Sequence, residues 1–151
     1  MSITRRLTDN SQPYPEGTWG FEPLTRTMVF DGGTANDPGD ESGTGNPADL
    51  FVVTGIVEAR IYVHCTVDLE GATATFEVGI AGDTDLFVAT TTGTDTTDAI
   101  TASLASGLAS YLISTGTIIQ TVAVADITAG TLVYTCEWMP RSAGATVAVA
   151  S

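Results

Sequence analysis

The sequence contains no lysine, and its only basic side chains are five arginines. The 18 Asp and Glu residues outnumber them and give the 151-residue chain a formal net charge of -13. A surface of this kind repels nucleic acids and anionic membranes, because both are negatively charged. We therefore expect neither as a partner. The charge itself is expected to serve solubility; a basic partner surface or a high-salt habitat is the alternative.

Histidine and cysteine are nearly as scarce as lysine. His64 is the single histidine, and the two cysteines, Cys65 and Cys136, lie far apart with no CxxC pair. A zinc site of the usual kind needs several such ligands close together. Neither a GxSxG elbow nor a GxxxxGK[ST] loop occurs. We therefore expect no enzyme, no cofactor and no metal site. The cysteines are expected to be buried free thiols, with a disulfide between neighbouring strands as the alternative.

Long hydrophobic runs are also missing. No stretch of 18 apolar residues occurs, and no basic segment followed by an apolar one opens the sequence. The expectation is a chain that neither spans a membrane nor is secreted by a classical route.

The clearest pattern that is present covers residues 51–69. Every second residue from Phe51 is apolar or small, whereas the other register carries Glu58, Arg60 and His64. A period of two predicts a β-strand with one buried face. A single strand of this length would span roughly 60 Å, too much for a small domain. We therefore predict a bend or break at Gly55.

Shorter segments of the same kind follow, and they predict an all-β fold. The segment 73–80 is expected to form a hairpin with the strand before it. The segment 117–125 is apolar on both faces, which is typical of a central strand or an interface. One short helix is expected at 99–106, capped by Asp98. The fold class is an antiparallel β-sandwich or jelly roll. The remaining expected strands are 24–31, 85–92, 109–114, 131–139 and a final short strand or tail within 143–151.

Residues 1–23 show no period and contain three prolines, so they are predicted to form an extended N-terminal arm in front of a sandwich domain at 24–151. Large aromatic side chains outside the main β pattern are candidate interface anchors. The alternative is that the arm folds back onto the core of its own domain. The candidate partner-binding residues are Arg5, Arg6, Tyr14, Trp19 and Phe21.

Residues 32–49 are rich in Gly, Asp, Asn and Pro and predict a long, exposed, acidic loop. Four carboxylates in it could gather around calcium: Asp37, Asp40, Glu41 and Asp49. Their spacing does not match the helix-loop-helix calcium signature, so no metal is assigned. Asp83 and Asp85 could share an ion, although an Asp in a turn more often bonds its own backbone.

The last third of the chain carries a resemblance. The segments 118–122 (IIQTV), 125–134 (ADITAGTLVY) and 138–140 (WMP) resemble small structural proteins of tailed bacteriophages. In those proteins a strand ends in a D-[IL]-T-A-G turn, and an aromatic strand followed by a proline closes the domain. Residues 78–85 and 98–100 are similar too, so that the resemblance covers about residues 50–142.

This resemblance implies a component of the virion, and a head decoration (capsid cement) protein above all. The expected partner is the major capsid protein. The expected assembly is a homotrimer, located on the exterior of the capsid. The chain is too short to be the major capsid protein of a tailed phage, whose fold is mixed α/β. The alternative function is a tail or fibre knob that binds a host receptor, such as a glycan. A calcium-dependent carbohydrate-binding module is a third.

Overall fold

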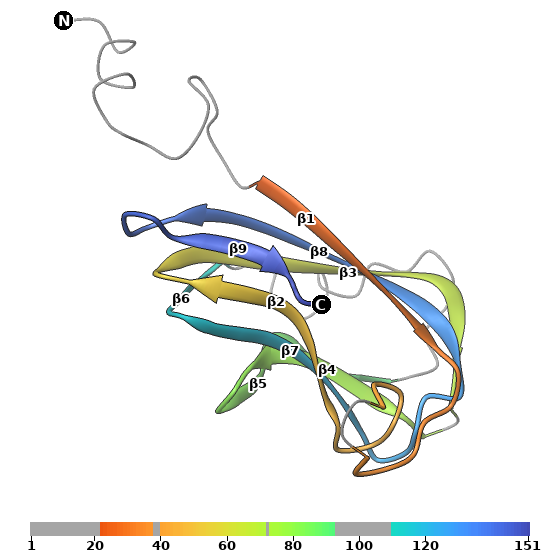
Figure 1. The fold of residues 1–151 in the computed structure, drawn as a ribbon. Helices are drawn as coiled ribbons and strands as arrows, with labels where there is room; N and C mark the ends of the chain where they lie inside the picture. The colour runs from red at the N-terminus through yellow and green to blue at the C-terminus, as the bar shows by residue number, and fades with distance from the viewer. Residues whose placement is uncertain (1–21, 38–39, 72, 93–109) are drawn as a thin grey trace, which may run out of the picture.

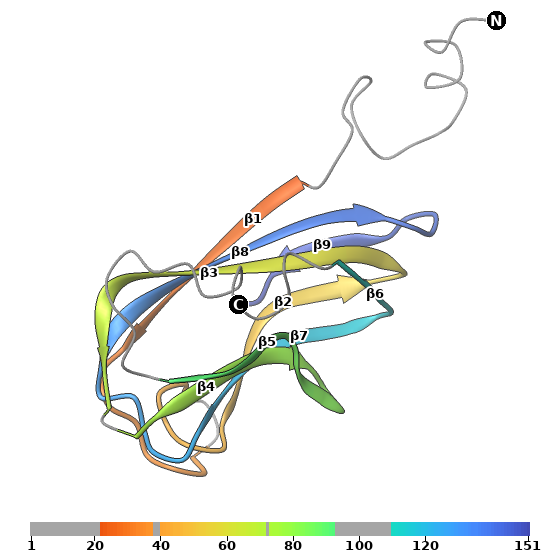
Figure 2. The same ribbon diagram turned by 180° about the vertical axis from the view of Figure 1, so that it is seen from behind.

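In a computed structural model of the chain, the described residues are 22–37, 40–71, 73–92 and 110–151. They form two antiparallel sheets that pack face to face as a sandwich (Figure 1). The view from behind shows the same two layers (Figure 2). The strands are β1 (Glu22–Phe30), β2 (Pro47–Thr54), β3 (Val57–Glu70), β4 (Thr75–Ile80), β5 (Asp83–Thr92), β6 (Tyr111–Ile113), β7 (Gly116–Ala123), β8 (Ala129–Pro140) and β9 (Thr146–Val149).

The strand pairing follows the order of a jelly roll. One sheet has the order β1-β8-β3-β6 and the other β5-β4-β7-β2-β9. The first eight strands therefore pair as β1 with β8, β2 with β7, β3 with β6 and β4 with β5, each pair nested inside the one before. Two sheets of four strands paired in this way form a jelly roll, and β9 extends one of them. The predicted all-β sandwich is confirmed, whereas the arm up to residue 21 and the helix expected at 99–106 lie outside the described residues.

The break predicted at Gly55 is confirmed, and it moves the chain from one sheet to the other. β2 ends at Thr54 in the five-stranded sheet, and β3 begins at Val57 in the four-stranded sheet. Gly55 has φ 76°, a left-handed conformation that favours glycine. A Cβ atom there would also meet the Ala145 Cβ at 2.9 Å. The long periodic segment is thus two strands that bury the same register against one core.

That buried register holds along β3 with one exception, Val67. Alternate residues from Val57 to Cys65 are buried, and so is Leu69, but Val67 is 54% exposed. The reason is a pair of irregularities in the β3–β8 ladder, one between Cys65 and Val67 and one between Val67 and Glu70. At each irregularity β3 has one residue more than β8. The first irregularity places the Val67 side chain on the solvent face, and the second returns Leu69 to the core face. The prediction that Val67 faces the core is therefore wrong.

The hairpin predicted for residues 73–80 is also wrong. β4 pairs with β5 and β7, whereas both neighbours of β3 are other strands, β8 and β6. After β3 the chain turns at Gly71, whose carbonyl accepts a hydrogen bond from the Ala74 amide at 2.8 Å, and crosses to the opposite sheet. The predicted buried face is right, because Ala74, Phe76 and Val78 are buried.

β7 and β8 mostly confirm the expectations for the last third of the chain. β7 lies centrally, between β4 and β2. It ends at Ala123 rather than at residue 125, because Val124 adopts φ 70° and projects into solvent. The buried face of β8 is the predicted one: Leu132, Tyr134, Cys136 and Trp138.

Both cysteines are buried and free, as predicted. In the β3–β8 ladder Cys136 lies opposite Ile61, and Cys65 lies opposite Leu132. Burial, and secondly the charge of Glu137, raises the pKa of Cys136 to about 12. A thiol with so high a pKa is almost entirely protonated near neutral pH, so it acts as a small apolar core residue.

Candidate interaction surface

The five residues predicted to bind a partner, Arg5, Arg6, Tyr14, Trp19 and Phe21, lie outside the described residues. The other three arginines are described, and each forms an ion pair with a glutamate. Arg26 pairs with Glu41, Arg60 with Glu137, and Arg141 with Glu58. The positive charge of the described surface is therefore already matched within the domain.

The acidic segment before β2 is not the fully exposed loop that its composition predicted. β2 begins at Pro47, so the loop ends at residue 46, and Ser42 and Asn46 are buried. The Asn46 side-chain amide donates to the carbonyls of Thr34, at 3.1 Å, and Asp40, at 2.8 Å. The Asp40 carboxylate accepts from the Thr34 amide at 2.5 Å. The described part of the loop is therefore held together by hydrogen bonds among Thr34, Asp40 and Asn46.

This loop is fastened to the segment that joins β7 to β8. The Asp126 carboxylate accepts hydrogen bonds from the Thr44 amide at 2.6 Å and from the Thr44 hydroxyl at 2.8 Å. The Ile127 amide donates to the Ser42 carbonyl at 3.0 Å, and the Gly45 amide to the Val122 carbonyl at 2.9 Å. The two hydrogen bonds from Thr44, first that of its amide and then that of its hydroxyl, hold the pKa of Asp126 below its ordinary value. Composition alone could not reveal them, because the partners are about 80 residues apart in sequence.

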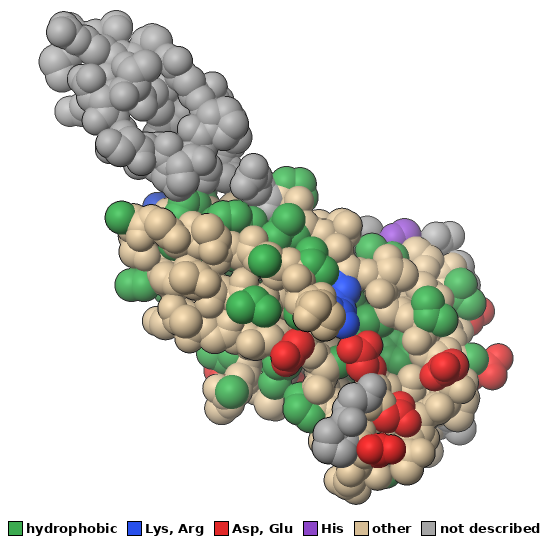
Figure 3. Space-filling view, in the orientation of Figure 1, with side chains coloured by type: hydrophobic (Ala, Val, Ile, Leu, Met, Phe, Trp, Pro, Cys, Tyr) green, Lys and Arg blue, Asp and Glu red, His purple; other side chains and the backbone are tan. Residues whose placement is uncertain are grey.

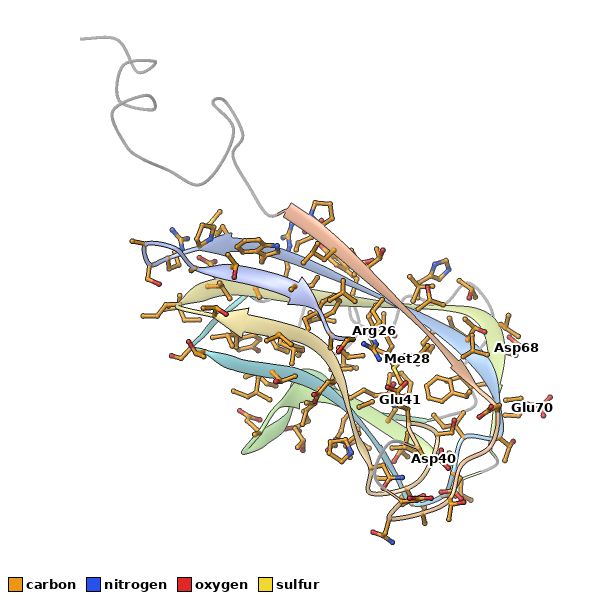
Figure 4. The ribbon with its side chains drawn as sticks, viewed as in Figure 1. Arg26, Met28, Asp40, Glu41, Asp68 and Glu70 are labelled. Atoms are coloured by element: carbon orange, nitrogen blue, oxygen red, sulfur yellow. The ribbon has the colours of Figure 1, made fainter. Side chains whose placement is uncertain are left out.

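A second attachment of the loop lies beside β1. Glu41 and Arg26 approach each other there, with 3.0 Å between Oε1 and Nη2 (Figure 4). Arg26 also donates to the Ala150 carbonyl just beyond β9. This contact joins the two sheets along one open side of the sandwich.

Beneath this ion pair the core contains a polar pair, Tyr134 and Gln120. Both side chains are fully buried, and the Tyr134 hydroxyl donates to Gln120 Oε1. Burial, followed by the charge of Glu41, raises the pKa of Tyr134, while Arg26 opposes the shift. Tyr134 therefore remains a neutral hydrogen-bond donor throughout the physiological range.

The carboxylates considered for calcium do not converge. Asp40 is occupied by Thr34, Glu41 by Arg26, and Asp49 lies on β2. Within the part of the chain that the structure describes, no three His, Cys, Asp or Glu side chains are grouped to hold a metal ion. Asp83 and Asp85 do lie together: desolvation, then a hydrogen bond and repulsion from Asp85, raise the pKa of Asp83.

Carboxylates gather at the end of the molecule where β1 terminates, with hydrophobic side chains among them (Figure 3). Asp68 and Glu70 lie at this end (Figure 4). Two exposed valines belong to the same region: Val29 on β1, 71% exposed, and Val67 on β3. Both lie opposite Thr131 of β8. We refer to Val29, Val67, Thr131 and Val133 as the valine patch, and it is the candidate interaction surface of the domain.

Comparisons with known proteins give no further guide to a site, since no family model, curated protein or solved structure matches the chain. The described residues also contain no helix of sufficient length and apolarity to cross a membrane.

The Asp126–Thr44 contact gives a pH-dependent prediction. Because the pKa of Asp126 is lowered on folding, its contribution to stability is present above the ordinary value of 3.8 and is lost as the pH falls through the folded value. Asp126→Asn should lower the melting temperature at pH 7, and the difference from the wild type should shrink at acid pH. Thermal unfolding between pH 2 and 7 measures this, with Asp49→Asn, at an exposed position on β2, as the control. Melting curves that stay equally separated at every pH would contradict the prediction.

Proposed function

We propose that the chain is a non-enzymatic structural protein of a phage virion that decorates the outside of the capsid and stabilises the shell. A jelly roll is used by viral capsid domains and by lectins, and a fold alone does not fix a function. The observation that carries the proposal is the surface, where exposed valines lie at an acidic end of the sandwich. Such a surface suits binding to another protein.

The residues that carry the phage resemblance have structural roles in this fold. The D-I-T-A-G motif runs from Asp126, in the connection after β7, to Gly130, the second residue of β8. Asp126 holds the acidic loop, Ile127 is buried in the core, and Gly130 lies against the bulged part of β3. One short motif thus joins a loop, the core and a sheet, which gives a physical reason for the motif to accompany a fold. This supports the proposal at the level of architecture.

In this proposal the partner is the major capsid protein, the protein is a homotrimer, and residues 1–23 contribute to the anchor. A capsid presents the same contact many times, so a trimer that engages several sites binds tightly even if each contact is weak. The aromatic side chains Tyr14, Trp19 and Phe21 would supply the buried anchors.

The test is cosedimentation of the full-length protein with purified capsids of the phage that encodes it. Trp19→Ala/Phe21→Ala should weaken binding about tenfold or more, since truncating an aromatic anchor often costs over 1 kcal/mol. Leu112→Ala is the control, because Leu112 is an exposed hydrophobic residue on β6, outside the arm. Unchanged saturation of the shell by the arm variant would show that the arm is not the anchor.

The alternative, a tail or fibre knob that binds a receptor glycan, has one observation in its favour. Tyr62, on the outer face of β3, is half-buried, with the Arg60 guanidinium 5.7 Å from its ring centroid. Glu137 accepts hydrogen bonds from both side chains. An aromatic ring beside charged hydrogen-bonding groups can contact a sugar. Retention on a glycan array by a protein that does not bind capsids would replace the decoration proposal with this one.

A further inference from the structure

The outer face of the five-stranded sheet carries no charge where β2, β7 and β9 lie side by side. In the two ladders, Val52 of β2 lies between Thr117 of β7 and Ala148 of β9. Thr54 and Thr146 form another cross-strand pair on the same face. Four of these residues are exposed, and Thr117 is half-buried. We refer to the five residues as the neutral face.

This face is produced by the pairing of distant segments that are all free of charge. Residues 50–57, 111–123 and 142–151 contain no Asp, Glu, Arg, Lys or His, although the chain has 18 acidic residues. Since β2 pairs with β7 on one side and with β9 on the other, the fold brings the three segments together. Carboxylates gather at the end where β1 terminates, whereas hydrophobic and uncharged side chains predominate where β9 begins (Figure 3). The molecule thus has an acidic end and a charge-free sheet face.

The open edge of the same sheet borders the neutral face. β9 is the last strand of the sheet, and no further strand of the described residues pairs with it. The Ala150 amide donates to the Leu50 carbonyl at 3.0 Å, so Val149, one residue earlier, directs its amide and carbonyl away from β2. Val149 is 42% exposed, although it lies opposite the buried Phe51. Exposed edges are commonly guarded by charged side chains or proline, and β9 contains neither.

Charge decides which protein fits this surface. A basic partner gains more at the acidic end, where carboxylates can pair with its cations. A second copy of the chain has the opposite requirement, because two molecules that each carry a net charge of -13 repel one another. They can approach closely only where neither presents a carboxylate, and the cores of protein interfaces are likewise depleted of charged residues. The neutral face meets this requirement, so its occupant is another copy.

We propose that copies of the chain contact one another through the neutral face and the adjoining edge of β9. The number of copies rests on the homotrimer of the proposed function, in which three neutral faces would lie around the common axis. The contact itself follows from the charge distribution of the domain and requires no capsid. The valine patch lies on the outer face of the other sheet, so a copy can make both contacts at once.

The experiment measures the mass of the full-length protein by sedimentation velocity, over a range of concentrations at low and at high salt. The wild type should associate, and association should strengthen as the salt concentration rises, because salt screens the repulsion between acidic copies. A contact between carboxylates and arginines would weaken instead. A protein that stays monomeric at every concentration and salt level would overturn the proposal, as would association that weakens with salt.

A pair of variants with the same net charge tests the position of the contact. Val52→Glu should raise the dissociation constant tenfold or more, because it places like charges at the centre of the contact. Val124→Glu should leave it unchanged, since Val124 is 72% exposed but follows the end of β7, outside the neutral face. Melting temperatures show whether each variant is folded, and Thr146→Glu, on β9, repeats the test if Val52→Glu unfolds the domain. If the folded variants of the neutral face associate as well as Val124→Glu, the contact lies elsewhere.

Cosedimentation with capsids separates this contact from the decoration role. Self-association that depends on Val52, in a protein that binds no capsid, would support the contact and reject the proposed function. Capsid binding by a protein that remains monomeric in solution would reject the contact and leave the decoration role in place.

Discussion

Ile61→Asp is expected to leave the chain unfolded at room temperature. Ile61 is 4% exposed on the core face of β3, opposite Cys136 of β8. An unpaired charge at such a position costs several kcal/mol, and loss of the buried side chain adds about 2–5 kcal/mol. The sum approaches or exceeds the whole stability of an ordinary domain, about 5–15 kcal/mol. Far-ultraviolet circular dichroism should show loss of the β signal at 25 °C.

Glu58→Gln, on the same strand but on the outer face, is the matched control. Glu58 accepts hydrogen bonds from Arg141 and from the Ser110 hydroxyl, and the side chains of the ion pair are partly exposed. Surface pairs of this kind contribute at most about 1 kcal/mol, so the variant should remain folded with a slightly lower melting temperature. Comparable losses in the two variants would mean that β3 does not bury its odd-numbered register.

Gly130→Ala should produce the second large effect, a loss of roughly 2–4 kcal/mol in the free energy of unfolding. Gly130 has φ 120°, which a side chain rarely adopts. A Cβ atom there would also lie 2.7 Å from the Asp68 carbonyl oxygen and 2.8 Å from the Leu69 Cα. Both contacts are to backbone, so the bulged segment of β3 would have to move. Urea unfolding followed by tryptophan fluorescence measures the change.

Gly116→Ala is the control for this substitution. Gly116 begins β7 without a positive φ, and a Cβ atom there would meet a single neighbour at 3.7 Å. The effect should fall within about 0.5 kcal/mol of zero. If Gly130→Ala is equally mild, the close approach of β8 to the bulge is not a constraint. If it is severe, the valine patch depends on a glycine in the D-I-T-A-G turn.

The face that each strand buries could be read from the sequence, because side chains alternate along a strand irrespective of its partners. Residues 51–69 and the face of β8 illustrate this. The break at Gly55 could also be predicted from the sequence, since a single strand over residues 51–69 would be longer than a small domain. Free cysteines followed from two well-separated residues on buried registers.

Which strands pair with one another could not be predicted from the sequence in the same way. Residues 73–80 looked like the second half of a hairpin, but pairing is decided by which edges remain open once distant strands have met. β3 has β8 on one side and β6 on the other, so β4 joined the opposite sheet. A local pattern contains no information about such competition between remote segments.

The features of the candidate surface likewise fall into those that the sequence sets and those that the tertiary structure sets. The sequence by itself determined the negative charge, the apolar alternation, and the adjacent basic pair Arg5 and Arg6, because these depend only on residue types and their spacing. The tertiary structure alone decided that Val67 faces outward, and that the acidic loop is fastened to Asp126. The bulges follow from a mismatch of two residues between β3 and β8, and the loop contacts join segments about 80 residues apart. Both are relations between distant parts of the chain, which only the packed fold brings together.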